Sequence, residues 1–180
     1  MIFFSSDHHF NHANILEYCN RDFGSTQEMN DSLVRSWNST VSSHDTVYYM
    51  GDFCFCNYAK ATEYISLLNG NILYILDKTH HDKTWASRVS YGYSGNGIKF
   101  LPSMITEKIN GIFITMCHFP MHSWNKEHYG AWMLHGHTHS SYRDGGSRKI
   151  LDIGVDSARR ILGEYRPFSF DEVRNEIIGE

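Results

Sequence analysis

Residues 45–52 read DTVYYMGD, and this stretch decides the fold. Its centre, residues 47–50, is continuously apolar or aromatic, as in a strand that is buried on both faces of a sheet. Gly51 and Asp52 follow the run directly. Ligand sites in α/β sheets form beyond the carboxyl ends of the strands, so the acid at position 52 indicates where a site would lie.

Other segments supply the rest of an α/β pattern. Short apolar runs predict strands at 2–6 and 71–76, and a helix is expected over 57–68 between them. Capping boxes predict a helix from Ser25 to about residue 41 and a final helix over 169–177. Asn110-Gly111 predicts a hairpin within 104–119, and strands are expected at 131–139 and 149–156. Early alternation followed by antiparallel strands predicts a layered α/β domain with mixed sheets.

Size and charge limit the classes of protein. The 180 residues fit one domain, 1–180, with no separate cap domain. Non-specific nucleic-acid binding favours a basic surface, whereas this chain has a net charge of −4. A nucleic-acid polymer is therefore not the favoured substrate. Neither a signal peptide nor a run of about 18 apolar residues occurs, which predicts a cytoplasmic protein with reduced thiols and no membrane contact.

The unusual feature is where the acids and histidines fall. Each predicted strand at 2–6, 45–52, 71–76, 104–119 and 131–139 is followed by side chains that bind metals. Carboxyl ends of neighbouring strands meet at one edge of a sheet, so these side chains should converge. They are Asp7, His9, Asp52, His80, His81, Asp82, His118, His137 and His139.

The residue types point to a particular chemistry. Carboxylate with imidazole suits borderline divalent ions such as Mn, Fe, Zn, Ni or Co better than Mg or Ca, and manganese is favoured here. Two such ions about 3.5–4 Å apart can hold the attacking and leaving oxygens of a phosphoryl displacement. They can also lower the pKa of a bound water to roughly 7, which supplies hydroxide at neutral pH.

The motifs SDHHF, GDF, THHD, CHFP and GHTH resemble those of the calcineurin-like metallophosphoesterases, in the same order along the chain. The resemblance runs from residue 5 to about 156, and the tail GVD…YRPFSFDEV is similar to that of small bacterial and phage members. It implies a four-layer αββα sandwich of two mixed sheets and a dinuclear centre. It further implies a first metal on Asp7, His9 and His139, a second on His118 and His137, and Asp52 bridging both.

The stretch THHD departs from the family pattern, which has Gly-Asn-His-Asp. By resemblance, His81 stands beside the leaving-group oxygen, where it can donate a proton, and Asp82 orients it. The asparagine that ligates the second metal is replaced by His80, and the glycine before it by Thr79. Imidazole is a stronger donor than an amide, so we expect His80 to bind the second metal; a reshaped loop with a half-filled second site is the alternative.

Several polar and aromatic residues have open interpretations. His12 could contact substrate. Alternatively, His12 or Asn11 could cap a helix. Arg21 could pair with a substrate phosphate or form a surface salt bridge. Cys54 and Cys56 are expected to pack at a strand end. The tryptophans Trp85, Trp124 and Trp132 could stack on a nucleobase or pack in the core.

The leading functional prediction is a phosphodiesterase that acts on a small phosphodiester or nucleotide. A phosphomonoesterase or nuclease of the same family is an alternative, as is a non-catalytic metal-bound scaffold suggested by THHD. A metallo-β-lactamase-like hydrolase is excluded, because His139 is followed by Ser140, Ser141 and Tyr142 rather than the required Asp-His. The oligomeric state is not predicted.

Overall fold

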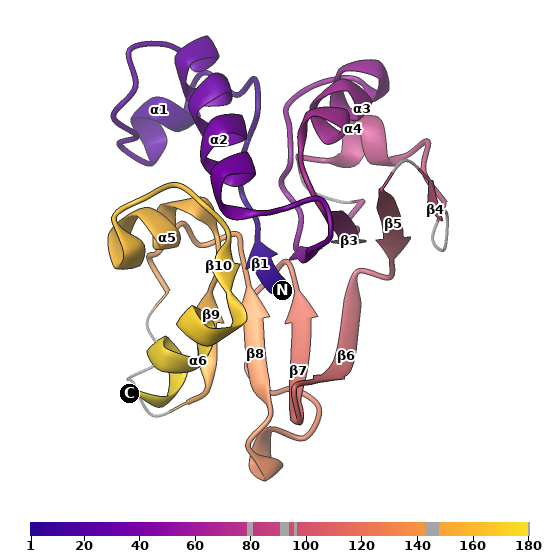
Figure 1. The fold of residues 1–180 in the computed structure, drawn as a ribbon, viewed down its shortest axis with the longest axis vertical. Coiled ribbons are helices and arrows are strands. Elements are labelled where there is room, and N and C mark those ends of the chain that lie inside the picture. Colours follow the sequence, from indigo (N-terminus) through magenta and orange to yellow (C-terminus); the bar gives the residue numbers. More distant parts are fainter. Residues whose placement is uncertain (79–80, 91–93, 96, 143–147, 180) are drawn as a thin grey trace.

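Two mixed β-sheets form the framework of the computed structural model, which describes residues 1–78, 81–90, 94–95, 97–142 and 148–179 (Figure 1). The larger sheet has the strand order β10-β1-β2-β3-β5-β4. Its central pairs β1–β2, β2–β3 and β3–β5 are parallel, and both edge pairs are antiparallel. Its strands are β1 (Ile2–Ser5), β2 (Thr46–Tyr49), β3 (Asn71–Ile75), β4 (Ser94–Gly95), β5 (Ile98–Leu101) and β10 (Phe168–Ser169).

The smaller sheet has the order β6-β7-β8-β9. It consists of β6 (Met104–Ile109), β7 (Ile112–Cys117), β8 (Trp132–His135) and β9 (Ile150–Asp152). The predicted hairpin is present, with Asn110 and Gly111 both at positive φ in the turn between β6 and β7. The antiparallel pairing stops there, however, because β7–β8 and β8–β9 are parallel. The expectation that the later strands are antiparallel is therefore wrong beyond β7.

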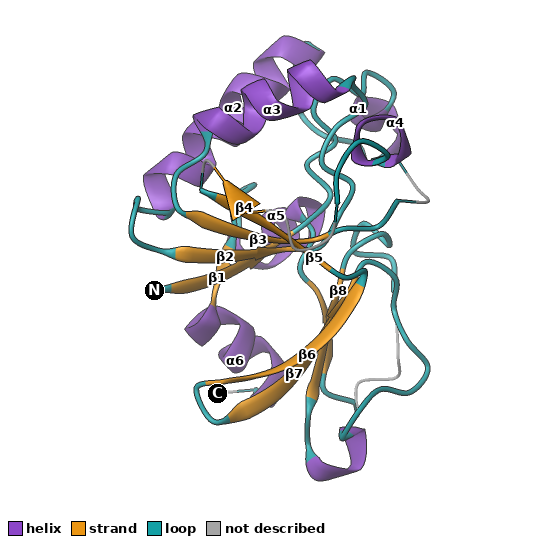
Figure 2. Ribbon diagram, turned by 90° about the vertical axis from the view of Figure 1, so that its right-hand side faces the viewer, coloured by secondary structure: helices purple, strands orange, loops and turns teal. Residues whose placement is uncertain are grey.

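The helices lie on different sides of the larger sheet. Four of them, α1 (Ile15–Tyr18), α2 (Thr26–Thr40), α3 (Tyr58–Leu67) and α4 (Lys83–Ala86), lie on one side, and α6 (Phe170–Ile178) lies on the other side next to the smaller sheet (Figure 2). The remaining elements are α5 (Val155–Leu162) and the short 3-10 helix η1 (Glu127–Tyr129). The α/β fold with two mixed sheets is confirmed.

Both faces of strand β2 are buried, which explains why polar and apolar residues do not alternate in its sequence. Val47 and Tyr49 pack in a core with α2 and α3, whereas Tyr48 and Met50 pack in a second core between the sheets. All four side chains are buried. A strand that is covered on both faces needs apolar side chains at every position, as residues 47–50 predict.

Among the described residues, a non-α-helical segment packs against the far face of the smaller sheet. Trp124 and Met133 form the centre of a small third cluster there. Trp124 belongs to the connection between β7 and β8, which also contains η1. The part of the outer layer that the structure describes on this side therefore includes this connecting segment.

Helix starts follow the sequence in most places. Ser25 caps α2 by accepting the backbone N–H of Glu28, and Ser169 and Glu172 form a complete capping box on α6. At α2 the reciprocal bond is displaced by one residue, because the Glu28 carboxylate accepts the N–H of Gly24. The strand expected over 149–156 is too long: β9 ends at Asp152, and residues 155 and 156 open α5, which has no side-chain cap.

The two sheets are joined at the carboxyl ends of their strands. Ser6, just after β1, forms a parallel bridge with Gly154, just after β9. Within each sheet the pairing also continues past the strands, since Asp7 donates its N–H to the carbonyl of Gly51 (3.1 Å) and Gly136 donates to that of His118 (3.0 Å). The loops that carry the acids and histidines are thereby held against one another.

Two observations concern the cellular setting expected from the sequence. No helix in the part of the chain that the structure describes has both the length and the apolar character needed to cross a membrane. Cys54 and Cys56 form a disulfide, so the expectation of reduced thiols is wrong for this pair, while Cys19 and Cys117 are free thiols.

Candidate metal centre

Side chains from five loops meet where the two sheets are joined. Among the described residues, four groups of three acids, histidines or cysteines place their ligand atoms within 4.8 Å of one another, and two of these groups consist only of predicted metal ligands. The first group is Asp7, His9 and His139, and the second is Asp52, His118 and His137. The division matches the two ligand sets that the sequence resemblance implies, although metal coordination itself stays a prediction.

Asp52 belongs to the second group and also lies close to the first. Its Oδ2 atom is 3.6 Å from Nε2 of His9 and 3.4 Å from Nε2 of His118. Nitrogen and oxygen ligands bind transition metals at about 2.0–2.2 Å, so two ligands of one ion lie roughly 3–4 Å apart. The separations around this single oxygen fit a carboxylate that is shared between two cations.

The buried imidazole of His9 provides a test of whether a metal fits. Its side chain is only 1% exposed, yet neither ring nitrogen has a hydrogen-bond partner in the described structure. Its Nε2 is 3.9 Å from Oδ1 of Asp7, too far for a hydrogen bond but suitable for two ligands of one ion. An unsatisfied buried nitrogen costs about 1–3 kcal/mol, and a cation between these side chains would remove that cost.

Two of the candidate ligands are oriented through their other ring nitrogen. Nδ1 of His118 lies 2.7 Å from the carbonyl of Met50, and since a carbonyl can only accept, the ring donates from Nδ1 and directs Nε2 at Asp52. Nδ1 of His139 likewise donates to Oδ2 of Asp156 at 2.6 Å. Metal-binding histidines usually donate their second nitrogen in this way, which fixes the tautomer.

Asp156 contacts the candidate ligand His139 and was not among the predicted site residues. It accepts from His139 and, through both carboxylate oxygens, from Nε and Nη2 of Arg21 at 2.8 Å each. The only signal in the sequence was its place in the tail motif GVD.

Arg21 has neither of its two predicted roles. It is 3% exposed, so its ion pair is buried and is not a surface salt bridge. Its Nη1 and Nη2 atoms donate to the carbonyls of His8 (2.8 Å) and Asp7 (2.7 Å), while the rest of the guanidinium faces Asp156 and Met29. With its N–H groups directed into the protein, Arg21 holds the loop after β1 in place and does not face a substrate phosphate.

Asp7 is held by close neighbours. Its carboxylate accepts the hydroxyl of Ser6 and the backbone N–H of His137, the latter at 3.0 and 3.1 Å. Gly136 is needed here because a Cβ atom would overlap with the Asp7 carboxylate, and a Cβ on Gly154 would lie 2.7 Å from Asp7 Oδ2. The two glycines leave the space in which the carboxylate sits.

Burial and proximity shift the charges of the site. Burial raises the pKa of Asp7 from 3.8 to about 6, although the nearby His118 and His139 oppose the shift. Burial lowers the pKa of His118, but its interaction with Asp52 outweighs this and raises the value to about 9. The pKa of His139 is likewise lowered by burial and raised overall, to about 11, by its bond to Asp156. Without metal these imidazoles hold protons that a cation must displace.

The backbone of the site is strained. Non-glycine residues with positive φ cost about 1 kcal/mol each and tend to persist at functional sites. The two candidate ligand groups contain five of them: Asp7 (59°), His9 (54°), Asp52 (53°), His137 (68°) and His139 (45°). In the motif D-x-H, both Asp7 and His9 have this left-handed conformation and contribute to the first group, whereas in H-x-H the same conformation accompanies one side chain in each group, His139 in the first and His137 in the second.

His81 and Asp82 lie beside the first group. The ring of His81 packs edge-on against that of His9 with centroids 4.9 Å apart. The backbone N–H of His81 donates to Oδ1 of Asp52 at 3.3 Å. Asp82 accepts from Phe53 N–H (2.9 Å), Cys54 N–H (3.4 Å), Tyr74 Oη (2.5 Å) and Trp85 Nε1 (2.9 Å). The ring of His81 is not among these partners, so any influence of Asp82 on it passes through the backbone that joins them.

The remaining predicted residues differ in outcome. His80 and Thr79 lie outside the described residues, so coordination by His80 stays a prediction. His12 does not cap a helix, because the N-cap of α1 is Asn14. The side chain of Asn11 also has no capping role, since it bonds Asn30 and Tyr64. The tryptophans Trp85, Trp124 and Trp132 are at most 7% exposed and pack in the cores, which excludes base stacking by them.

Comparisons with known proteins give a family but no activity. The chain is 34% identical to the uncharacterized protein MJ1445 of Methanocaldococcus jannaschii over 177 residues, 94% of this chain and 87% of that protein. The crystal structure of AQ665 from Aquifex aeolicus, a protein of unknown function, superposes with a TM-score of 0.65 at 18% identity, covering 98% and 99% of the two chains, and shows the same fold. Zinc-bound wild-type Vps29 from Entamoeba histolytica gives a TM-score of 0.40 at 15% identity over 85% of this chain and 73% of its own. No protein-family model matches. By its similarity over nearly its whole length, the chain belongs to the family of MJ1445.

Proposed function

We propose that the protein is a dinuclear metal-dependent phosphoesterase of the calcineurin-like type, and that it hydrolyses a small phosphodiester such as a nucleotide ester. The observation that supports this most directly is the position of Asp52 Oδ2, within 3.6 Å of an imidazole from each ligand group. A shared carboxylate of this kind is what holds two cations at the spacing that phosphoryl transfer uses.

The donor set agrees with this chemistry. Carboxylates and imidazoles favour manganese, iron, zinc, nickel or cobalt, and manganese is the first choice for assay. Two bound cations would neutralise phosphate charge and lower the pKa of a water molecule. The protein's own contribution is to fix the two ligand groups, through the Met50 carbonyl on His118 and the Asp156 carboxylate on His139.

His81 is the candidate general acid. It lines a cavity of about 510 Å³ together with His9 and His139, so it faces the space above the first ligand group. From there its imidazole can donate a proton to the oxygen of the departing group. The partial exposure of His81, in contrast to buried His9, supports a role toward substrate.

The test is hydrolysis of nitrophenyl phosphodiester and monoester substrates with Mn, Ni, Zn or Mg added. Asp52→Asn should abolish turnover and reduce the bound metal. His81→Ala should slow turnover about 10²–10⁴-fold while leaving metal content intact, as loss of a general acid does. His44→Ala, which removes an exposed histidine that precedes β2, at the end of the strand opposite to Asp52, is the matched control and should behave as wild type.

The outcomes separate the alternatives. A preference for the monoester would favour a phosphomonoesterase. If the protein binds two metal ions and cleaves neither ester, catalysis is rejected and a metal-bound scaffold takes its place, as the altered motif THHD allows. Absence of metal binding would overturn both.

A further inference from the structure

A second cavity adjoins the one above the ligand groups. It has a volume of about 530 Å³ and shares His12, Tyr18 and His81 with the first cavity. Its other lining residues include Asn11, Asn14 and Phe55. A molecule whose phosphate lay at the metal centre would therefore extend past His81 into a space bordered by aromatic rings and amides.

Two of these rings are unusually exposed. Tyr18 is 70% exposed and Phe55 is 60% exposed, although most large apolar side chains of the protein are buried. Both contact His12, with ring centroids 6.2 Å away for Tyr18 and 5.1 Å for Phe55. Exposed apolar groups that gather beside a polar site mark a binding surface more often than isolated ones do.

The exposed ring of Phe55 is carried by a constrained backbone. The disulfide between Cys54 and Cys56 encloses it, and its N–H donates to the carbonyl of Phe10 at 2.8 Å. Phe10 and Cys54 also form a parallel bridge. A backbone that is already constrained in the free protein loses little conformational entropy when a ligand stacks on the ring that it carries.

Asn11 adds a polar group at the wall of the same cavity. Its Oδ1 accepts hydrogen bonds from Asn30 Nδ2 (2.8 Å) and Tyr64 Oη (2.9 Å), so the oxygen is directed into the protein. The amide NH₂ is left as the end that can donate to a ligand. A ligand with a flat aromatic face and an acceptor on its edge would satisfy both features.

We propose that Tyr18, Phe55 and Asn11 form a subsite for the base of a nucleotide, which deepens the proposed phosphodiesterase function and rests on it. Bases stack on aromatic side chains, and carbonyl or ring-nitrogen acceptors on their edges pair with amide donors. An apolar chain would use the rings but not the amide, so the cavity favours a base.

The test compares two diesters with the same leaving group, p-nitrophenyl thymidine 5′-phosphate and methyl p-nitrophenyl phosphate, on the manganese-loaded full chain. The ratio of kcat/KM for the first over the second should fall in Phe55→Ala and Tyr18→Ala. Loss of one base–aromatic stack corresponds to roughly 5- to 150-fold. Phe55→Trp should keep the ratio, and Phe55→Leu, which keeps an apolar side chain without a ring, should not.

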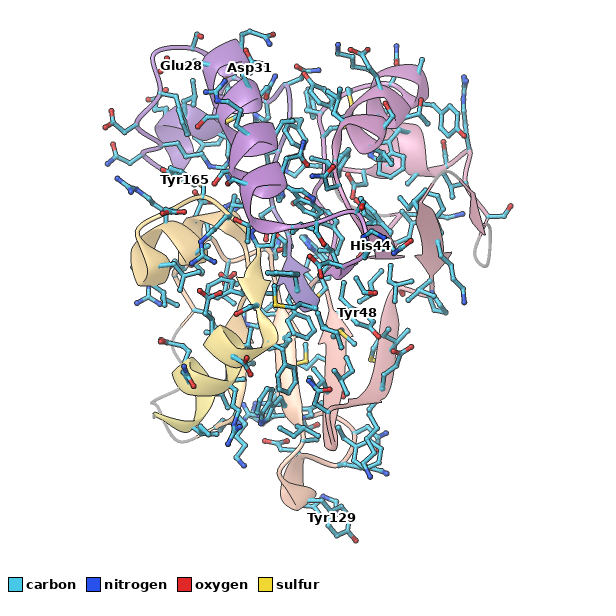
Figure 3. All side chains as sticks on the ribbon, viewed as in Figure 1. Glu28, Asp31, His44, Tyr48, Tyr129 and Tyr165 are labelled. Atoms are coloured by element: carbon cyan, nitrogen blue, oxygen red, sulfur yellow. A yellow bond between two sulfur atoms is a disulfide. The ribbon has the colours of Figure 1, made fainter. Side chains whose placement is uncertain are left out.

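Tyr129→Ala is the matched control, because Tyr129 is 79% exposed and lies at the opposite end of the molecule from α1 and α3 (Figure 3). Its ratio should equal that of wild type. Equal ratios in wild type, Phe55→Ala and Tyr18→Ala, with both esters cleaved, would overturn the base subsite and leave the phosphodiesterase intact. A ratio retained in Phe55→Leu would overturn stacking in favour of a general apolar contact.

Binding separates this proposal from the proposed function. Thymidine 5′-monophosphate should bind the manganese-loaded protein more tightly than inorganic phosphate, and Phe55→Ala should remove that difference. If neither ester is cleaved but this binding pattern is found, the hydrolase is overturned and the base subsite is supported. Equal binding of the two probes would overturn the subsite.

Discussion

Arg21 and Asp156, separated by 135 positions in sequence, form a two-point ion pair in the interior, with Nε–Oδ1 and Nη2–Oδ2 distances of 2.8 Å. The pair joins the connection between α1 and α2 to the start of α5. Because Asp156 also accepts from His139, and Arg21 also donates to the carbonyl of Asp7, one ion pair orients two members of the first ligand group.

Arg21→Met should therefore weaken both stability and metal binding. Removing one partner of a buried ion pair leaves an uncompensated charge and costs about 3–5 kcal/mol of unfolding free energy. Loss of a group that orients a ligand lowers metal affinity about 10–100-fold. Urea denaturation and calorimetric titration with manganese would measure the two effects, with exposed Arg35→Met as the control. Wild-type metal affinity in Arg21→Met would contradict this role.

Because His137 has a positive φ, glycine at this position should give a more stable protein than alanine. His137→Gly and His137→Ala both delete the imidazole, but only alanine keeps a Cβ at φ 68°. The glycine variant should be more stable than the alanine variant by about 1 kcal/mol in urea denaturation of the chelator-treated protein. The same pair at exposed Glu63, inside α3, should show the opposite order, because glycine is the poorer helix former. The same order at both positions would argue against strain at residue 137.

Gly136→Ala tests the space around Asp7. The new Cβ would overlap with the Asp7 carboxylate and the Ser6 hydroxyl, so one of them must move. We expect a loss of about 1–3 kcal/mol in stability and fewer bound metal ions per chain, measured by denaturation and by elemental analysis. Gly24→Ala is the control, since its Cβ would meet only the flexible end of Glu28. Full metal content in Gly136→Ala would count against Asp7 as a ligand.

His8 predicts a pH dependence of stability. Burial, with a smaller effect of Arg21, lowers its pKa from 6.5 to about 3. Above pH 6.5 both folded and unfolded states carry a neutral ring, so its stability contribution is complete. As the pH falls below 6.5 the unfolded state binds a proton that the folded state does not, and stability is lost progressively toward pH 3. At pH 5 the loss from this one group amounts to about 2 kcal/mol.

Denaturation of the metal-free protein at pH 7 and pH 5 would measure this contribution against His8→Phe. The variant keeps an aromatic ring among Phe10, Trp37 and Tyr49 but cannot bind a proton. The decrease in unfolding free energy between the two pH values should be smaller in the variant by up to about 2 kcal/mol. Equal decreases in the two proteins would show that His8 is not the group responsible.

Elements defined by local patterns were predictable from sequence. The apolar run of β2, the cap of α2 at Ser25 and the turn at Asn110-Gly111 all depend on residues within a few positions of one another. The elements that were missed are short, such as α1 and α4, or lack a capping side chain, such as α5. Without a cap or a long periodic pattern, such segments depend on packing against distant parts of the chain.

The sequence by itself determined which side chains follow the strands, and so which acids and histidines could gather: strand ends are encoded by local apolar runs, and parallel strands present their ends at one edge. Only the tertiary structure decided what each polar group pairs with. It placed Arg21 in the interior on Asp156, the tryptophans in the cores, and Phe55 and Tyr18 in solvent beside His12. Burial and pairing depend on neighbours that are distant in sequence, and no local pattern contains that information.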